Sequence, residues 1–150
     1  AGAVAAGEGR SAAAGALDDG RALAAAERWV EAQGGDPAAW SQPERLPPAP
    51  LRLPVPAAAT GWVAALDALA VGQAARWLGA GRMHPVQSVD PAVGIELAAK
   101  VGDAAEEGEP VAWVHARDAA TGERAVAMVA AAARIEEGRV APPALVLREG

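Results

Sequence analysis

The sequence predicts an α+β fold, in which a short helical segment precedes a mixed body of short strands and two helices. Three observations support this prediction. Several short apolar runs have the length and composition of strands, as in residues 61–66 and 110–115. A dense group of prolines between residues 41 and 56 separates the beginning of the chain from the rest. Apolar residues recur at helical spacing in residues 20–32, 68–78 and 121–134.

The first forty residues are predicted to be mostly helical. A helix over residues 20–32 begins with a cap at Asp18 or Asp19, because a short acidic side chain accepts hydrogen bonds from the first unpaired N–H groups. Gly34-Gly35 ends it, and Asp36-Pro37 starts a short turn that ends near Trp40. The apolar stripe of the helix consists of Leu23, Ala26 and Val30, with Trp29 beside it.

The proline-rich stretch is predicted to be an extended connector. Proline has no N–H to donate and fixes its own φ angle, so this density disfavours both a helix and a central strand. The main boundary of the chain is therefore placed here. We expect a helical segment over residues 1–42, the connector over 43–56 and a folded domain over 57–150.

The body begins with a strand over residues 61–66, followed by a helix over 68–78. Asp67 lies at the junction and is predicted to cap this helix. Gly79-Ala80-Gly81 ends the helix, because glycine tolerates the backbone conformations of a helix end. The side chains expected to point inward are Leu69, Ala70, Ala74 and Trp77.

The second half of the body alternates strands and one helix. Residues 93–100 are a strand candidate that ends in the turn Val101-Gly102-Asp103, and residues 104–109 form an acidic loop. The strand over 110–115 is followed by a helix over 121–134, for which Thr121 can serve as the cap. The apolar stripe of that helix is Val126, Val129, Ala130 and Ala133. Residues 140–147 form the last strand, placed at a sheet edge because of Pro142-Pro143.

Composition and charge exclude several classes of function. The net charge is −6 and only one lysine is present, so binding of nucleic acid through a basic face is not expected. The chain has no cysteine and two histidines, which excludes a disulfide framework and a thiolate zinc site. No apolar run is long enough to span a membrane, and no signal peptide is recognised, so we expect a cytoplasmic protein that needs no metal or cofactor.

No residue stands out as catalytic. His115 falls within a predicted strand and is interpreted as a half-buried structural residue, and His84 is expected in a surface loop. The serines lie in no nucleophile elbow. Asp67, Asp90, Asp103 and Glu109 could in principle pair as carboxylates, but a helix cap, a turn before proline and a hairpin turn account for the first three without chemistry.

Two glycine-rich strings are candidates for a phosphate site. A phosphate cradle needs a glycine-rich loop that opens a helix, whereas Gly79-Ala80-Gly81-Arg82 closes one. Gly34-Gly35-Asp36-Pro37 precedes a helical turn, but the carboxylate of Asp36 repels an anion. Both strings are therefore interpreted as chain-shaping elements. The string Lys100-Val101-Gly102-Asp103 also resembles a hairpin of biotinyl and lipoyl carrier domains, but the later stretch His115 to Ala119 contains no lysine to modify.

A set of motifs does carry a family resemblance. The strings are Gln33-Gly34-Gly35-Asp36-Pro37, Asp67-Ala68-Leu69-Ala70-Val71-Gly72, Leu78-Gly79-Ala80-Gly81-Arg82, Asp90-Pro91-Ala92-Val93-Gly94-Ile95 and Lys100-Val101-Gly102-Asp103. In combination they resemble the C-terminal portion of pyrimidine nucleoside phosphorylases, the family of thymidine phosphorylase. The resemblance implies an α/β-hammerhead, barrel-sandwich-like domain from about residue 57 onward. It also implies that the residues before Pro43 are the last helices of the preceding catalytic region.

The resemblance implies a reaction as well. Family members cleave thymidine or uridine with phosphate to give the free base and a (deoxy)ribose 1-phosphate, holding phosphate in a Lys-His-Ser-Thr-Gly-Gly loop. This chain lacks that loop, so no catalytic residue is transferred to it and the chain alone is expected to be inactive. Its expected partner is the catalytic half of the same enzyme. The parent protein is expected to bind phosphate and pyrimidine nucleoside and to form a homodimer. The alternatives are a stand-alone assembly or binding module and a carrier domain modified at Lys100.

Overall fold

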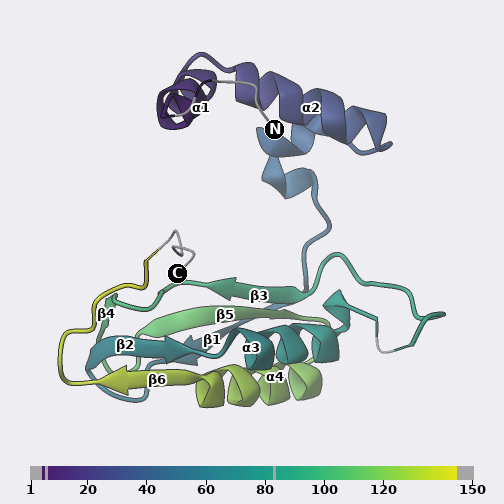
Figure 1. Ribbon diagram of the computed structural model, residues 1–150. Coiled ribbons are helices and arrows are strands. Elements are labelled where there is room, and N and C mark those ends of the chain that lie inside the picture. Colours follow the sequence, from purple (N-terminus) through teal and green to yellow (C-terminus); the bar gives the residue numbers. More distant parts are fainter. Residues whose placement is uncertain (1–4, 6, 83, 145–150) are drawn as a thin grey trace. The chain divides into compact units, whose positions relative to one another are not determined.

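The computed structural model describes residues 5, 7–82 and 84–144, and it divides into two compact units (Figure 1). The first unit is Ala1–Leu46 and the second is Pro47–Gly150, so the division falls inside the proline-rich stretch. Within the described ranges, no helix has both the length and the apolar character that a membrane span requires.

The first unit consists of helices joined by tight turns. The end of the second helix follows the prediction: Gly34 has φ of 78°, and the Gly35 N–H donates to the Val30 carbonyl at 2.9 Å. Its start differs, because the cap position is Gly20 and Asp19 instead accepts a hydrogen bond from the Arg21 N–H at 3.0 Å. The elements are α1 (Gly9–Asp18), α2 (Arg21–Ala32), η1 (Pro37–Trp40) and η2 (Pro43–Arg45). Asp36 caps η1 as predicted, accepting from the Ala38 N–H at 3.0 Å.

The first unit has no core of its own. None of its described residues is buried, and Leu23 and Trp29 of the predicted apolar stripe are 51% and 67% exposed. Leu17, Trp40 and Leu46 are also exposed by more than half. A helical segment of this kind gains little from burial by itself, since helices in proteins are stabilised mainly by packing of an apolar face.

The second unit contains two small antiparallel sheets. The first has the order β1-β5-β3, with β1 at Leu51–Pro56, β5 at Pro110–Ala116 and β3 at Gly94–Leu97. The second has the order β4-β2-β6, with β4 at Ala104–Ala105, β2 at Gly61–Leu66 and β6 at Ala133–Glu136. The prediction of a mixed helix-and-sheet chain is confirmed, with antiparallel strands throughout the paired segments.

Two helices pack together on the same side of the first sheet (Figure 1). Helix α3 (Ala68–Ala75) continues into a single wide turn, η3 (Arg76–Ala80), and α4 (Ala119–Ala132) contacts both β1 and β5. Asp67 caps α3 as predicted, accepting from the Leu69 and Ala70 N–H groups at 2.9 and 3.1 Å. The cap of α4 is Asp118 and not Thr121, because the helix begins two residues earlier than predicted.

The core lies between the sheets and the two helices and is built from small side chains. Val55, Val63, Val111, Val114 and Val129 are its largest fully buried side chains. The predicted inward face of this helical segment is right for Ala74, which is fully buried, and wrong for Leu69 and Trp77, which are 71% and 40% exposed. Leu78, which was not predicted to point inward, is buried as well. In α4 the buried residues are Gly122, Ala125, Val129 and Ala132, while Ala130 is exposed.

Four predicted boundaries in this unit need correction. Leu51–Pro56, assigned to the connector, forms strand β1, which tolerates its prolines because it lies at a sheet edge. The strand predicted over 93–100 is limited to Gly94–Leu97, and the predicted acidic loop contains the short strand β4. Residues 140–144 form no strand, and residues 145–147 lie outside the described residues. The last described strand is β6, which follows α4 directly.

Candidate functional site

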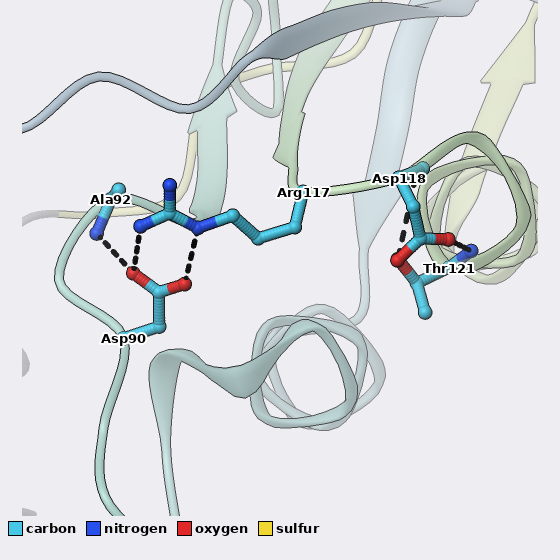
Figure 2. A network of polar contacts seen from close by, with 5 residues as sticks. All are labelled: Asp90, Ala92, Arg117, Asp118 and Thr121. Carbon is cyan, nitrogen blue, oxygen red and sulfur yellow. Dashed lines mark hydrogen bonds and ion pairs between the residues drawn. The ribbon is translucent and has the colours of Figure 1, made fainter.

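A polar network of the second unit joins the loop before β3 to the junction between β5 and α4 (Figure 2). Asp90 and Arg117 form a two-pronged ion pair, with the Arg117 Nε and Nη2 donating to the Asp90 carboxylate at 2.7 and 2.9 Å. The Ala92 N–H donates to the same carboxylate at 3.0 Å. These hydrogen bonds, that from Arg117 first, lower the pKa of Asp90 to about 2.

The network fixes the chain at both sides of this contact. The Asp90 N–H donates to the carbonyl of Gly79 at 2.9 Å, which ties the end of η3 to the start of the segment leading into β3. On the other side, Asp118 accepts from the Thr121 N–H and hydroxyl, each at 2.9 Å (Figure 2). Sequence reasoning explained Asp90 by its turn and missed Arg117, since 27 residues separate the pair and no local pattern joins them.

His115 is partly exposed and hydrogen-bonded, as its structural interpretation requires. Its side chain is 32% exposed, and its Nε2 lies 3.2 Å from the Glu96 carboxylate on the neighbouring strand. Arg52 of the other neighbouring strand donates to that carboxylate at 3.3 Å and stacks on the Trp113 ring. Hydrogen bonds from His115 and then Arg52 lower the pKa of Glu96. Side chains of β1, β3 and β5 thus form one hydrogen-bonded network on the surface of the sheet. Among the described residues, no serine hydroxyl contacts His115.

The remaining candidate acids act on the backbone. Asp103 accepts from the Lys100 N–H at 2.8 Å and stabilises the predicted turn. Glu109 accepts from the Glu106 N–H at 3.0 Å across the next turn. His84 is exposed in a turn, as expected. Within the described ranges, no group of three or more histidine, aspartate or glutamate side chains is placed to hold a metal ion.

One depression of the second unit is acidic. It has a volume of about 930 Å³ and is open to solvent at the end of strand β2. Its ring of carboxylates makes it unsuited to phosphate or to any other anion. The residues that line it are Thr60, Gly61, Trp62, Ala104, Ala105, Glu106, Glu107, Glu109 and Glu137.

The glycine strings have the shaping roles that were predicted. Gly79 has φ of 107° in the last turn after α3, so this string ends a helix and presents its carbonyl groups rather than a cradle of N–H groups. The stretch His115 to Ala119 runs from the end of β5 into α4. It is therefore not the hairpin tip at which a carrier domain would present a modified lysine.

Comparison with known proteins gives a consistent family assignment. Residues 62–136 match the pyrimidine nucleoside phosphorylase C-terminal domain. Thymidine phosphorylase of Agrobacterium fabrum is 42% identical over 79% of this chain, and pyrimidine-nucleoside phosphorylase of Geobacillus stearothermophilus is 41% identical over 67% of it. Thymidine phosphorylase of Burkholderia cenocepacia is 38% identical over 89% of the chain.

The matched segment is a small part of each relative. It covers 27%, 23% and 31% of these three proteins in turn, so the chain spans less than a third of the length of each of these curated relatives. The predicted resemblance is confirmed by the domain match and by these relatives together. The chain belongs to the pyrimidine nucleoside phosphorylase family and carries its C-terminal domain.

Proposed function

We propose that this chain is the C-terminal region of an enzyme that splits thymidine or uridine with phosphate into the pyrimidine base and (deoxy)ribose 1-phosphate. The proposal is supported by the domain match and by relatives named thymidine or pyrimidine-nucleoside phosphorylase. The relatives are several times longer than the matched segment, so the proposal places the residues that bind substrate in the polypeptide that this chain does not contain.

We further propose that the chain alone does not catalyse this reaction. The observation that carries the proposal is that its polar side chains already make hydrogen bonds within the chain. Within the described ranges, Asp67, Asp90, Asp103 and Asp118 each accept backbone N–H groups, and His115 is paired with Glu96. A general base or nucleophile needs a reacting group within hydrogen-bond reach and a cleft to hold it. The Lys-His-Ser-Thr-Gly-Gly loop that the family uses for phosphate is absent from the sequence.

The role proposed for the chain is structural support of the catalytic half. Residues from about 57 onward would form the C-terminal domain with the hammerhead arrangement, to which β1 adds one strand at a sheet edge. The residues before Pro43 would be the last helices of the catalytic region. The exposed apolar side chains of the first unit support this, because such a surface is stabilised when another part of the protein covers it. The parent enzyme would be a cytoplasmic homodimer.

Complementation tests the proposal. The chain alone, mixed with thymidine and phosphate, should release no thymine in an absorbance assay. A separately purified catalytic half, containing the Lys-His-Ser-Thr-Gly-Gly loop, should gain thymine release when this chain is added. Release of thymine by the chain alone would overturn the proposed division of labour.

A stand-alone assembly or binding module is the second candidate. The observation in its favour is that the second unit has its own apolar core, with five valines fully buried. Size-exclusion chromatography with the catalytic half separates the two candidates. A complex that gains phosphorolysis supports the enzyme, and a catalytic half that neither binds this chain nor responds to it supports the module.

A further inference from the structure

The first unit contains an open apolar cleft. Its volume is about 360 Å³, and it is lined by residues from the end of α2, from η1 and from the segment that holds η2. The apolar lining comes from Val30, Ala39, Trp40 and Leu46. All of these residues belong to the first unit, so the cleft is complete within it.

Local contacts hold the walls of this cleft in place. Gly35 brings the chain so close to α2 that a Cβ there would lie 2.7 Å from the Val30 Cγ1. Asp36 caps η1 and pairs with Arg45, whose Nε and Nη2 lie 2.7 and 2.6 Å from one oxygen of its carboxylate. The hydrogen bond from Arg45, followed by that from the Ala38 N–H, lowers the pKa of Asp36. The two charges that line the cleft thus neutralise each other, and the surface left for a partner is apolar.

The apolar surface continues beyond the cleft along α2. Leu23 and Ala26 precede Val30 by seven and four positions, so they share its face of the helix. Leu23, Trp40 and Leu46 are 51%, 54% and 56% exposed. Large apolar side chains grouped around one concave site are typical of a surface that another part of a protein covers.

The family relationship indicates what covers this surface. The C-terminal domain match begins at residue 62, so the first unit lies outside that domain. The similarity to thymidine phosphorylase of Burkholderia cenocepacia extends over 134 of 150 residues, so it begins no later than residue 17 and includes residues 17–46 of the first unit. More than two thirds of that relative lies outside the matched segment, which covers 31% of it.

We propose that this cleft is the site at which the catalytic half of the enzyme docks on this chain, with an apolar side chain of the catalytic half inserted between Trp40 and Leu46. The inference rests on the proposed function and adds the place of association to it. No described residue of the first unit is buried, so its helices depend on a partner for burial of their apolar face. A tryptophan at a preformed apolar cleft is a typical binding anchor, because little order has to be created on binding.

Co-expression of the tagged 150-residue chain with the catalytic half tests the site, because the two parts can then fold together. Size-exclusion chromatography of the purified complex at falling concentrations gives its dissociation constant. Trp40→Ala should weaken the complex about thirtyfold and Leu46→Ala about tenfold, as expected for truncated anchor side chains. Leu69→Ala is the matched control, because it removes a leucine that is 71% exposed in the second unit, and it should leave the dissociation constant unchanged.

The outcomes separate this inference from the proposed function. A complex that forms equally well with Trp40→Ala and Leu46→Ala, or that Leu69→Ala weakens as much, would overturn the cleft as the docking site even if the complex is active. A complex that loses affinity through the cleft variants but releases no thymine would support the docking site and contradict the proposed function. A tagged chain that retains no catalytic half would overturn both. Circular dichroism verifies the fold of each variant; if Trp40→Ala is misfolded, Trp40→Phe replaces it and should show a smaller but measurable loss.

Discussion

Gly61 begins strand β2 at a point where the neighbouring strand β6 leaves no room for a side chain. A Cβ at this position would meet the carbonyl oxygen of Glu136, with the carbonyl carbon at 2.9 Å and the Ile135 Cγ2 at 3.0 Å. The first two atoms belong to the backbone, so they cannot move away without separating the two strands. Gly61→Ala should therefore destabilise the second unit.

The magnitude follows from two opposing effects. Forcing an extra methyl into a packed site costs about 1–3 kcal/mol, while replacing a strand glycine by alanine returns about 0.5–1 kcal/mol. The net expected loss is about 1–2 kcal/mol. With a denaturant slope of about 1.5 kcal/mol per molar urea, the unfolding midpoint should fall by about 1 M.

Gly72→Ala is the matched control for this prediction. Gly72 lies inside α3, and a Cβ there would meet nothing within 4 Å. Alanine is favoured over glycine in a helix by about 1 kcal/mol, so this variant should be more stable than the parent chain. Urea unfolding followed by circular dichroism measures both. Gly61→Ala as stable as the parent chain, or Gly72→Ala less stable than it, would refute the reasoning from local space.

Three further predictions concern the ion pair, a helix cap and the core. Because its pKa in the folded chain is about 2 against an ordinary 3.8, Asp90 contributes stability above pH 4 that is lost as the pH falls toward 2. Asp90→Asn and Arg117→Met should each lower the free energy of unfolding at pH 7. Each should also reduce the further loss of stability between pH 4 and pH 2, and an unchanged loss in this range would contradict the pairing. Asp67→Ala should cost about 1 kcal/mol by removing the cap of α3, with Asp67→Asn retaining most of it in urea unfolding. Val114→Ala removes two buried methyl groups and should lower the free energy of unfolding by about 2–3 kcal/mol in the same urea experiment. A loss no larger than that of a valine-to-alanine change at an exposed position would show that β5 is not the centre of the core.

Much of the local structure could be predicted from residue types alone. Asp67 before an apolar helix, Gly34-Gly35 after one and Asp36-Pro37 at a new turn all act through atoms a few positions away. These signals depend on hydrogen bonds between near neighbours, so the surrounding fold cannot easily override them. The family resemblance rests on the same kind of short strings.

The inward face of α3 could not be predicted in the same way. Helical spacing puts Leu69 and Trp77 on one face with Ala70 and Ala74, and this pattern predicts that they are buried. The structure buries Ala74, as predicted, together with Leu78, because α3 packs closely against α4 and the core is built mainly of valine and alanine. Trp77 lies partly exposed beneath the Arg124 guanidinium. The two side chains line a cleft that no pattern in the sequence predicts.

The amino-acid sequence by itself determined the α+β composition, the caps of α3 and η1, the turn after α2 and the membership of the phosphorylase family, because each of these depends on local contacts or on recognisable strings. Only the tertiary structure decided which strands pair, that Leu51–Pro56 is an edge strand, and that Arg117 meets Asp90. Those outcomes join residues far apart in the chain. They depend on how the sheets and helices share one core, and the spacing of residues along a single segment does not contain that information.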